Sequence, residues 1–382
     1  MKNAERVALV LLASAVSLVF AGCQPAAATA GSGGVAAPVP VRVDLKGKLP
    51  PTFTATSIEV SIDRKRALID GNVPVMGPEG RVARFDRKCI LLTIDKGIAT
   101  PVLDLFGGSK ASAELLHLAA MSPDGQYLAV DSSQPVVQGA APRCKVRLLD
   151  IASGKVVGEL DRSANGLVWA GKRLLLSGGE SGKVQAYDPV TKKLEDLPIF
   201  GEVTASDLAG DRLLACAGMD PMKKPSGDDN PVQLVITPQG KVLCQLDKGG
   251  SSCSRQVPFI SPNGKYAALI HLPDSWSEFT EISTRAISLD DGKVSTIPWA
   301  YFMAVTDNGE PICCGEKGLQ IGRKKWEEFV PGDQAHAGKV VGGEFFYLTE
   351  PGHVFKSVTL PPVVDKPDWW TATKPASAPK AP

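Results

Sequence analysis

Short apolar runs alternate with turn-forming residues along most of this chain, from about residue 39 to residue 360. The runs are rich in Val, Ile, Leu and aromatic residues, and Gly, Asp, Asn and Pro separate them. Helical periodicity is almost absent from this region. Short apolar segments bounded by turn residues are typical of β-strands, so the pattern predicts an all-β body.

One hairpin motif occurs twice. The segment Ser122–Val130, with the sequence SPDGQYLAV, recurs at Ser261–Leu269 as SPNGKYAAL. In each copy Pro supplies a fixed φ and Gly supplies a positive φ, which together suit a tight turn. The apolar run that follows each turn predicts a buried strand.

A second repeated element is a polar turn that ends in lysine. Its copies end at Lys155, Lys193, Lys241 and Lys293, which are separated by 38, 48 and 52 residues. One four-stranded propeller blade takes about 40 to 50 residues. Hairpin content and spacing therefore both predict blades.

The Ser-Pro-Asp/Asn-Gly-x-Tyr hairpins and the Lys-ending turns resemble those of bacterial WD-repeat and Tol-system-type β-propellers. The resemblance implies a seven-bladed β-propeller, with six or eight blades as alternative counts. Residues 39–45 alternate apolar and polar positions outside any blade, and we expect them to form an N-terminal strand that closes the ring. The expected blades span Ser57–Leu105, Leu116–Leu160, Gly166–Leu197, Val203–Leu246, Val257–Ile297, Tyr301–Phe329 and His336–Leu360.

The first residues predict export and lipid attachment. Lys2 and Arg6 precede an apolar run that ends at Ala21-Gly22-Cys23, and the run is shorter than the roughly 20 residues that cross a bilayer as a helix. The pattern resembles the lipobox of bacterial lipoproteins, which implies that residues 1–22 are a signal peptide and that Cys23 is acylated. The alternative is an ordinary cleaved signal with an incidental cysteine.

The two ends of the chain have a different composition from the body. Residues 23–38 are an Ala/Gly/Pro-rich segment without charge, which predicts a disordered tether from the acylated cysteine to a propeller spanning residues 39–360. Residues 361–382 form a Pro/Ala-rich tail whose large apolar feature is Trp369-Trp370. These tryptophans either dock onto the body or remain available to a partner.

Composition narrows the partners and the chemistry. The net charge of +1 argues against a nucleic-acid partner. The four histidines occur singly, so neither a metal site nor a cofactor is expected. Without Cys23, seven cysteines remain. We expect most of them to be buried thiols, and we expect any disulfide to join Cys244 and Cys253, which flank a Gly-rich turn.

Candidate binding residues lie in the longest expected loops, which span Gly71–Gly80, Asp131–Arg143, Gly218–Pro231 and Leu272–Glu281. These loops join the second and third strands of a blade and would lie on one face of the ring, where binding residues are common. The alternative is that Trp276 and Phe279 cover the base of their own loop. The candidates for partner binding are Met76, Arg143, Met219, Met222, Lys223, Lys224, Trp276 and Phe279.

The first functional hypothesis is a lipid-anchored, non-catalytic protein-binding or assembly scaffold of the bacterial cell envelope. Cys23 would provide its membrane contact, and an envelope protein would be its partner. Gln24, and not Asp, follows the cysteine; by resemblance to lipoprotein sorting in diderm bacteria, this implies the periplasmic face of the outer membrane if the organism is diderm. The second hypothesis is an envelope hydrolase or oxidoreductase, which requires three or more inward-facing carboxylates or histidines near the mouth of the central channel.

Overall fold

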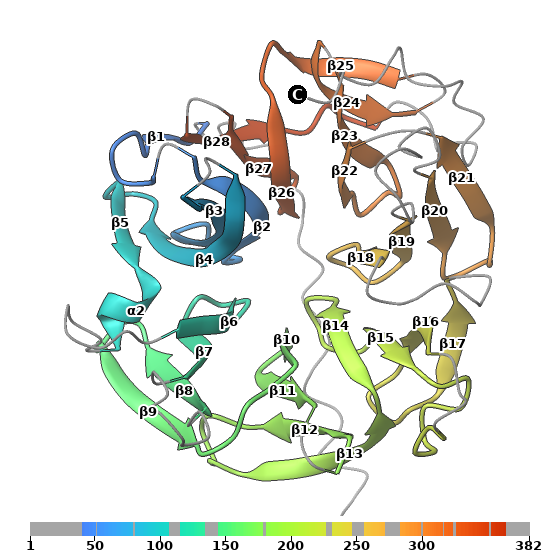
Figure 1. Ribbon diagram of the computed structural model, residues 1–382. Coiled ribbons are helices and arrows are strands. Elements are labelled where there is room, and N and C mark those ends of the chain that lie inside the picture. The colour runs from blue at the N-terminus through green and yellow to red at the C-terminus, as the bar shows by residue number, and fades with distance from the viewer. Residues whose placement is uncertain are drawn as a thin grey trace, which may run out of the picture. The chain divides into compact units, whose positions relative to one another are not determined.

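The computed structural model describes residues 40–50, 52–78, 81–106, 115–133, 144–178, 181–226, 231–246, 256–271, 283–298, 301–315, 317–323, 326–350 and 353–363. Within these residues the strands form seven four-stranded antiparallel sheets. The sheets are the blades of a ring (Figure 1), so the protein is a seven-bladed β-propeller. The predicted fold class and blade number are confirmed.

Each of the first six blades is built from four consecutive strands. Blade 1 contains β2 (Thr54–Val60), β3 (Arg66–Met76), β4 (Val82–Thr93) and β5 (Ile98–Pro101). Blade 2 contains β6 (Leu115–Met121), β7 (Tyr127–Ser133), β8 (Cys144–Asp150) and β9 (Lys155–Leu160). Blade 3 contains β10 (Gly166–Ala170), β11 (Arg173–Ser177), β12 (Lys183–Tyr187) and β13 (Leu194–Phe200).

The second half of the ring repeats this order. Blade 4 contains β14 (Glu202–Ser206), β15 (Leu213–Ala217), β16 (Val232–Ile236) and β17 (Val242–Gln245). Blade 5 contains β18 (Gln256–Ile260), β19 (Tyr266–His271), β20 (Ser283–Ser288) and β21 (Val294–Pro298). Blade 6 contains β22 (Tyr301–Val305), β23 (Pro311–Gly315), β24 (Gly318–Gly322) and β25 (Trp326–Pro331).

Blade 7 joins the two ends of the body. It contains β26 (Ala335–Val341), β27 (Glu344–Thr349) and β28 (Val354–Thr359) from the C-terminal end, and its fourth strand is β1 (Arg42–Asp44). Val43 of β1 pairs with Phe355 of β28 in antiparallel register. The predicted closure by an N-terminal strand is therefore confirmed.

Apolar side chains between neighbouring blades make up the core. One cluster joins blade 7 to blade 1 through Phe346, Phe355, Ile58 and Ile69, all of which are buried. Equivalent clusters lie between other adjacent blades. Because each blade buries both faces against its neighbours, stability grows with the number of blades.

The turn after the first strand of a blade has a recurring polar design. The Ser122 hydroxyl donates to Asp124 Oδ1 at 2.6 Å and accepts the Tyr127 amide at 2.8 Å. This satisfies backbone groups at a tight turn. Related turns span Ser61–Arg66, Asp207–Arg212, Ser261–Tyr266 and, one residue shorter, Thr306–Glu310.

These turns also link neighbouring blades. Arg66 donates from Nη1 to the Gly125 carbonyl at 2.8 Å, and Arg212 donates in the same way to the Gly264 carbonyl at 2.6 Å. At the equivalent position of blade 2, Tyr127 stacks on Trp169 of blade 3, with ring centroids 6.0 Å apart. The last residue of each of these turns, Arg66, Tyr127 or Arg212, therefore connects its blade to the next one.

The ring has two distinct faces because successive strands are antiparallel. The first-to-second and third-to-fourth turns of each blade lie on one face, which we call the turn face. The second-to-third loops lie on the other, the loop face. The chain enters and leaves the body at the turn face: the Ser357 amide donates to the Val41 carbonyl near the end of β28, and the Leu360 amide donates to the Gly343 carbonyl.

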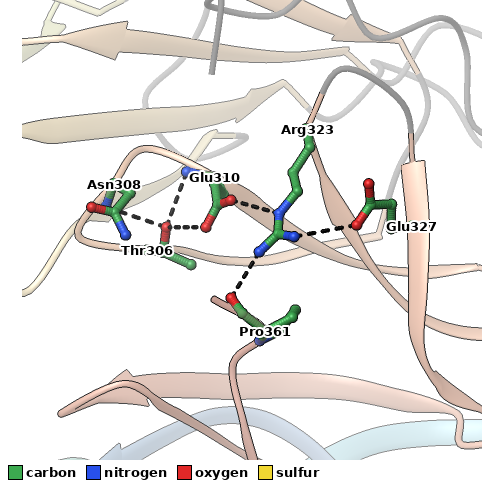
Figure 2. Close-up of polar contacts among 6 residues, drawn as sticks. All are labelled: Thr306, Asn308, Glu310, Arg323, Glu327 and Pro361. Carbon is green, nitrogen blue, oxygen red and sulfur yellow. Dashed lines mark hydrogen bonds and ion pairs between the residues drawn. The ribbon is translucent and has the colours of Figure 1, made fainter. Parts of the chain in front are cut away.

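A buried ion pair holds the C-terminal segment of the body (Figure 2). Arg323 donates from Nε to Glu310 Oε1 at 2.7 Å, and from Nη2 to the Pro361 carbonyl at 2.7 Å. The Glu310 side chain is 3% exposed and that of Arg323 is 13% exposed. This contact attaches the segment after β28 to blade 6, next to the site of ring closure.

In the described part of the chain the one helix is α2 (Val102–Leu105), a single turn after β5. No helix among these residues has the length and apolar character needed to cross a bilayer.

Candidate functional site: the β3–β4 arm and its groove

The β3–β4 hairpin extends beyond the rest of blade 1 on the loop face. β2 pairs with β3 only as far as Asn72, and β5 pairs with β4 only over Ile90–Thr93. Residues 73–78 and 81–88 therefore form a two-stranded projection, which we call the arm. Residues 71–80 were expected to be a loop, and this expectation is wrong because alternating apolar residues continue β3 to Met76.

The end of β5 leaves one side of the arm open. Pro101 is the last residue of β5, and the chain turns into α2 directly after it. Within the described residues, no strand pairs with the outer edge of β4 from Val82 to Cys89. Unpaired strand edges expose a row of backbone donors and acceptors.

An ion pair fixes the base of the arm to blade 1 and to blade 2. Arg87 donates from Nε to Asp70 Oδ1 at 2.9 Å, and a second guanidinium nitrogen donates to the other carboxylate oxygen. Arg87 also donates to the His117 carbonyl on β6. Although burial works against the charged form, the Asp70 carboxylate raises the pKa of Arg87 above its ordinary value, so the Arg87 guanidinium stays charged.

The neighbouring polar groups at the base are also satisfied. His117 Nε2 lies 2.7 Å from the Ser133 hydroxyl. Cys89 is buried beside the Asp70–Arg87 pair, and burial raises the pKa of its thiol well above the ordinary value. Cys89 is therefore a neutral thiol and not a reactive thiolate.

A groove of about 740 Å³ lies between the arm, α2 and the start of β6. Its walls carry two large exposed apolar side chains, Phe85 at 64% and Leu115 at 60%. Cations outnumber anions in the lining, which includes Lys48, Arg84, Arg87 and Lys88 against Asp86 and Asp104. We call this cavity the arm groove; its mixture of apolar and basic groups is typical of a protein interface.

The structure separates the candidate residues predicted from the sequence. Met76 lies near the tip of the arm and is exposed. Met222, Lys223 and Lys224 lie on the β15–β16 connection of blade 4, also exposed. Arg143, Trp276 and Phe279 lie outside the described residues, as does Cys23.

The β15–β16 connection is held against the neighbouring blade. The Phe200 amide at the end of β13 donates to the Pro221 carbonyl at 2.7 Å. Lys223 pairs with Asp220 at 3.3 Å. Met222 therefore lies on an anchored segment three blades away from Met76.

Several residues of the arm groove were not identified from the sequence. Phe85, Arg84 and Lys88 were treated as ordinary blade residues, and Leu115 was placed before the second blade. Because Val82–Phe85 and Val73–Met76 are both strand-like and flank a Gly-Pro turn, the extended hairpin had a local signal. The groove itself had no local sequence signal, because one of its walls comes from β6 of blade 2, which is separate from the arm in the sequence.

The central channel contains one carboxylate close to a lysine. A pocket of about 150 Å³ among the inner strands is lined by Glu59, Lys339 and Asp207, with Trp169 and other residues. Asp207 Oδ1 accepts three backbone amides of its own turn, at 2.8, 2.9 and 3.2 Å. Burial raises the pKa of Glu59 to about 7 and lowers the pKa of Lys339.

Within the described residues this pocket is lined by two carboxylates, whereas the enzyme hypothesis requires three or more inward-facing carboxylates or histidines. Glu59 Oε2 accepts the Met121 amide at 2.6 Å, which ties it to blade 2. In the same part of the chain, no group of three or more His, Cys, Asp or Glu side chains is placed to hold a metal ion.

The cysteines are arranged differently from the prediction. Cys244 is a free thiol, and burial raises its pKa to about 11. Among the described cysteines, Cys216 is instead the one that takes part in a disulfide. The predicted Cys244–Cys253 pair is therefore wrong, because Cys244 lies on β17 against β16, in register with Val235. Cys253 lies outside the described residues.

Comparison with known proteins supports the fold alone. No protein-family model and no curated protein matches the chain. A chain in the crystal structure of the mitotic checkpoint complex is similar with a TM-score of 0.51 and 11% identity, over 84% of this chain and 90% of that chain.

Two further similar structures are propellers from other sources. The β-propeller domain of the Trilobed protease from Pyrococcus furiosus gives a TM-score of 0.45 at 12% identity, covering 83% of this chain and 98% of that chain. BamB from Moraxella catarrhalis gives 0.40 at 14% identity, covering 80% and 85%. The class defined by the fold is the β-propeller, and the site has to be interpreted from its own chemistry.

Proposed function

We propose that the protein is a lipid-anchored, non-catalytic binding or assembly module of the bacterial cell envelope, and that it holds a protein partner in the arm groove. The exposed Phe85 and Leu115 beside the basic side chains of the groove carry this proposal. Exposed apolar groups of this size gathered on one face mark interaction surfaces.

The positions of the chain ends agree with this function. The body begins at the turn face, where Val41 contacts Ser357, and the arm lies on the loop face. An acylated Cys23 would attach the body to the membrane through residues 23–38, a tether with a root-mean-square span of roughly 20 to 25 Å. Because the described body begins on the turn face, its point of attachment does not cover the arm groove on the loop face. If the organism is diderm, Gln24 favours the inner surface of the outer membrane.

Site-specific crosslinking in intact cells tests the partner. A photoreactive amino acid at Phe85 is expected to trap an envelope protein, whereas the same group at Val190 is not. Val190 is a matched control because it is 78% exposed and lies on a β12–β13 turn of the opposite face. Equal labelling at the two positions would refute binding at the arm groove.

A separate experiment tests the anchor. Cells fed a labelled fatty acid are expected to label the protein, and Cys23→Ser is expected to abolish the label and release the protein from the membrane fraction. Absence of label on the parent protein, or equal labelling of Cys23→Ser, would contradict the proposed acylation.

A further inference from the structure

The arm has an edge whose backbone groups are oriented away from the blade. The Ile94 amide donates to the Lys65 carbonyl, and the β3–β4 register continues without a break from this point to Arg84 and Val75. Because hydrogen bonding alternates along an antiparallel strand, even-numbered residues of β4 bond to β3. The odd-numbered residues Phe85 and Arg87 therefore direct their backbone N–H and C=O groups to the outer edge.

The β4–β5 pairing supports this assignment. Pro101 lies opposite the even-numbered Ile90. Because Ile90 directs its backbone hydrogen bonds to β3, the missing N–H of Pro101 leaves no β4–β5 hydrogen bond unmade. Where β5 ends at Pro101, the outer edge of β4 is no longer covered, and from Cys89 to Arg84 it borders the arm groove. In the described part of the chain, the backbone groups of Phe85 and Arg87 on this edge have no strand partner.

The two faces of the arm differ in chemistry. Side chains alternate between the two faces of a strand. Arg87 contacts the His117 carbonyl of blade 2, so Arg87 and Phe85 lie on the face toward blade 2. The opposite face carries Arg84, Asp86 and Lys88. The first face combines Phe85 with the exposed Leu115 across the groove. On the second face Arg84 pairs with Asp86 at 2.9 Å, which leaves the charge of Lys88 without an ion-pair partner among the described residues.

We propose that the arm binds its partner by strand addition: an extended segment of an envelope protein, with alternating apolar and acidic residues, pairs with the outer edge of β4. Its backbone bonds to Phe85 and Arg87, its apolar side chains enter the arm groove, and its carboxylates face Arg84 and Lys88. This inference rests on the proposed function and specifies its mode of binding.

The charge of the arm disfavours two other occupants. A second copy of the arm on the same edge would place Arg84 and Lys88 near their own equivalents, and like charges on adjacent strands are destabilising. An anionic lipid surface suits the basic residues, but the tether enters on the opposite face of the ring. An acidic extended segment matches both the free edge and the charge.

Peptide selection tests the mode directly. The full chain, immobilised in detergent, is used to select from a display library of random peptides. The expected enriched sequences alternate apolar and acidic residues. The double variant Arg84→Glu/Lys88→Glu is expected to select alternating apolar and basic residues instead. Enriched sequences without alternation, or identical sequences for both proteins, would overturn the proposal.

Backbone methylation then separates strand addition from side-chain docking. A selected peptide is synthesised with N-methyl groups on every second residue, in both possible phases. One phase is expected to weaken binding at least about tenfold, equal to about 1.4 kcal/mol, and the other to bind nearly as well as the parent. Equal effects of the two phases would refute strand addition.

The same reagents distinguish the remaining outcomes. Concentration-dependent dimers that disappear in the Arg84→Glu/Lys88→Glu variant would assign the edge to a second copy. Binding to phosphatidylglycerol vesicles that is lost in the same variant would assign the arm to lipid. If Phe85 crosslinks an envelope protein but the selected peptides lack alternation, the proposed function stands and the strand-addition mode fails.

Discussion

The Arg323 ion pair allows a quantitative test of how the ring is held closed. In Arg323→Ala the Glu310 carboxylate, 3% exposed, remains buried without its cation. The Pro361 carbonyl loses its donor as well. Removing one partner of a buried ion pair costs about 3 to 5 kcal/mol, so this single change is expected to destabilise the whole propeller.

The expected shift in melting temperature follows from the size of the body. Unfolding entropy is about 2.1 cal/mol/K per residue, which gives about 0.7 kcal/mol/K for the compact unit Pro40–Pro382. A loss of about 3 to 5 kcal/mol then lowers the melting temperature by about 4 to 7 °C. Thermal unfolding monitored by circular dichroism measures this shift.

Two controls separate the buried charge from other effects. Lys223→Ala removes a cation from an exposed pair with Asp220, and its expected cost is at most about 1 kcal/mol. The double variant Arg323→Met/Glu310→Leu removes both charges and is expected to recover most of the stability lost in Arg323→Ala. If Arg323→Ala melts within about 1 °C of the parent, the role assigned to this pair is wrong.

Further expected outcomes concern pH, backbone conformation and cysteine chemistry. Burial raises the pKa of Glu59 from 4.5 to about 7; the native state therefore holds this proton more tightly than the unfolded state, and stability falls as pH rises from about 4.5 to about 7. Glu59→Gln is expected to flatten the melting-temperature profile in that window, and parallel profiles would contradict the assignment. Gly264→Ala and Gly292→Ala both place a side chain at a φ near +70°, but only Gly264 has an atom of the neighbouring blade within 3 Å of the added Cβ. Gly264→Ala is therefore expected to melt lower than Gly292→Ala, and the reverse order would exclude the blade-to-blade contact as the cause. Cys216→Ser is expected to cost about 2 to 4 kcal/mol through loss of the disulfide. Cys244→Ser should cost clearly less, because it removes a free thiol, and non-reducing denaturant melts of both variants measure the difference.

Local patterns predicted the fold well because each blade is a local structure. The turns at Ser122 and Ser261 carry their own hydrogen-bonding groups, so they are recognisable in a single sequence. The related turns at Ser61 and Asp207 use the same geometry with different residues. Neither turn carries the Ser-Pro-Asp/Asn-Gly sequence, so only the hydrogen-bonding pattern of the folded chain relates them to the turns at Ser122 and Ser261.

The candidate site was predicted less well because it depends on a strand edge, that of β4, which no other described strand covers. Met76 was correctly placed on the loop face, but as part of a loop and not of a strand. The open edge beside Phe85 exists because β5 ends at Pro101, and its length depends on how far two neighbouring strands extend. Met222 was grouped with Met76 on the loop face by loop length alone. The expected blades already separated the two residues, and the structure adds that the segment of Met222 is anchored to the end of β13.

The sequence by itself determined the all-β class and the closing strand and favoured seven blades over six or eight, since turn chemistry and strand periodicity act over a few residues. The tertiary structure alone decided which side chains meet across blades: Arg323 with Pro361, Glu59 near Lys339, and Phe85 opposite Leu115. These contacts depend on the relative positions of separate sheets. Those positions result from packing between blades, which leaves no periodic signal along the chain.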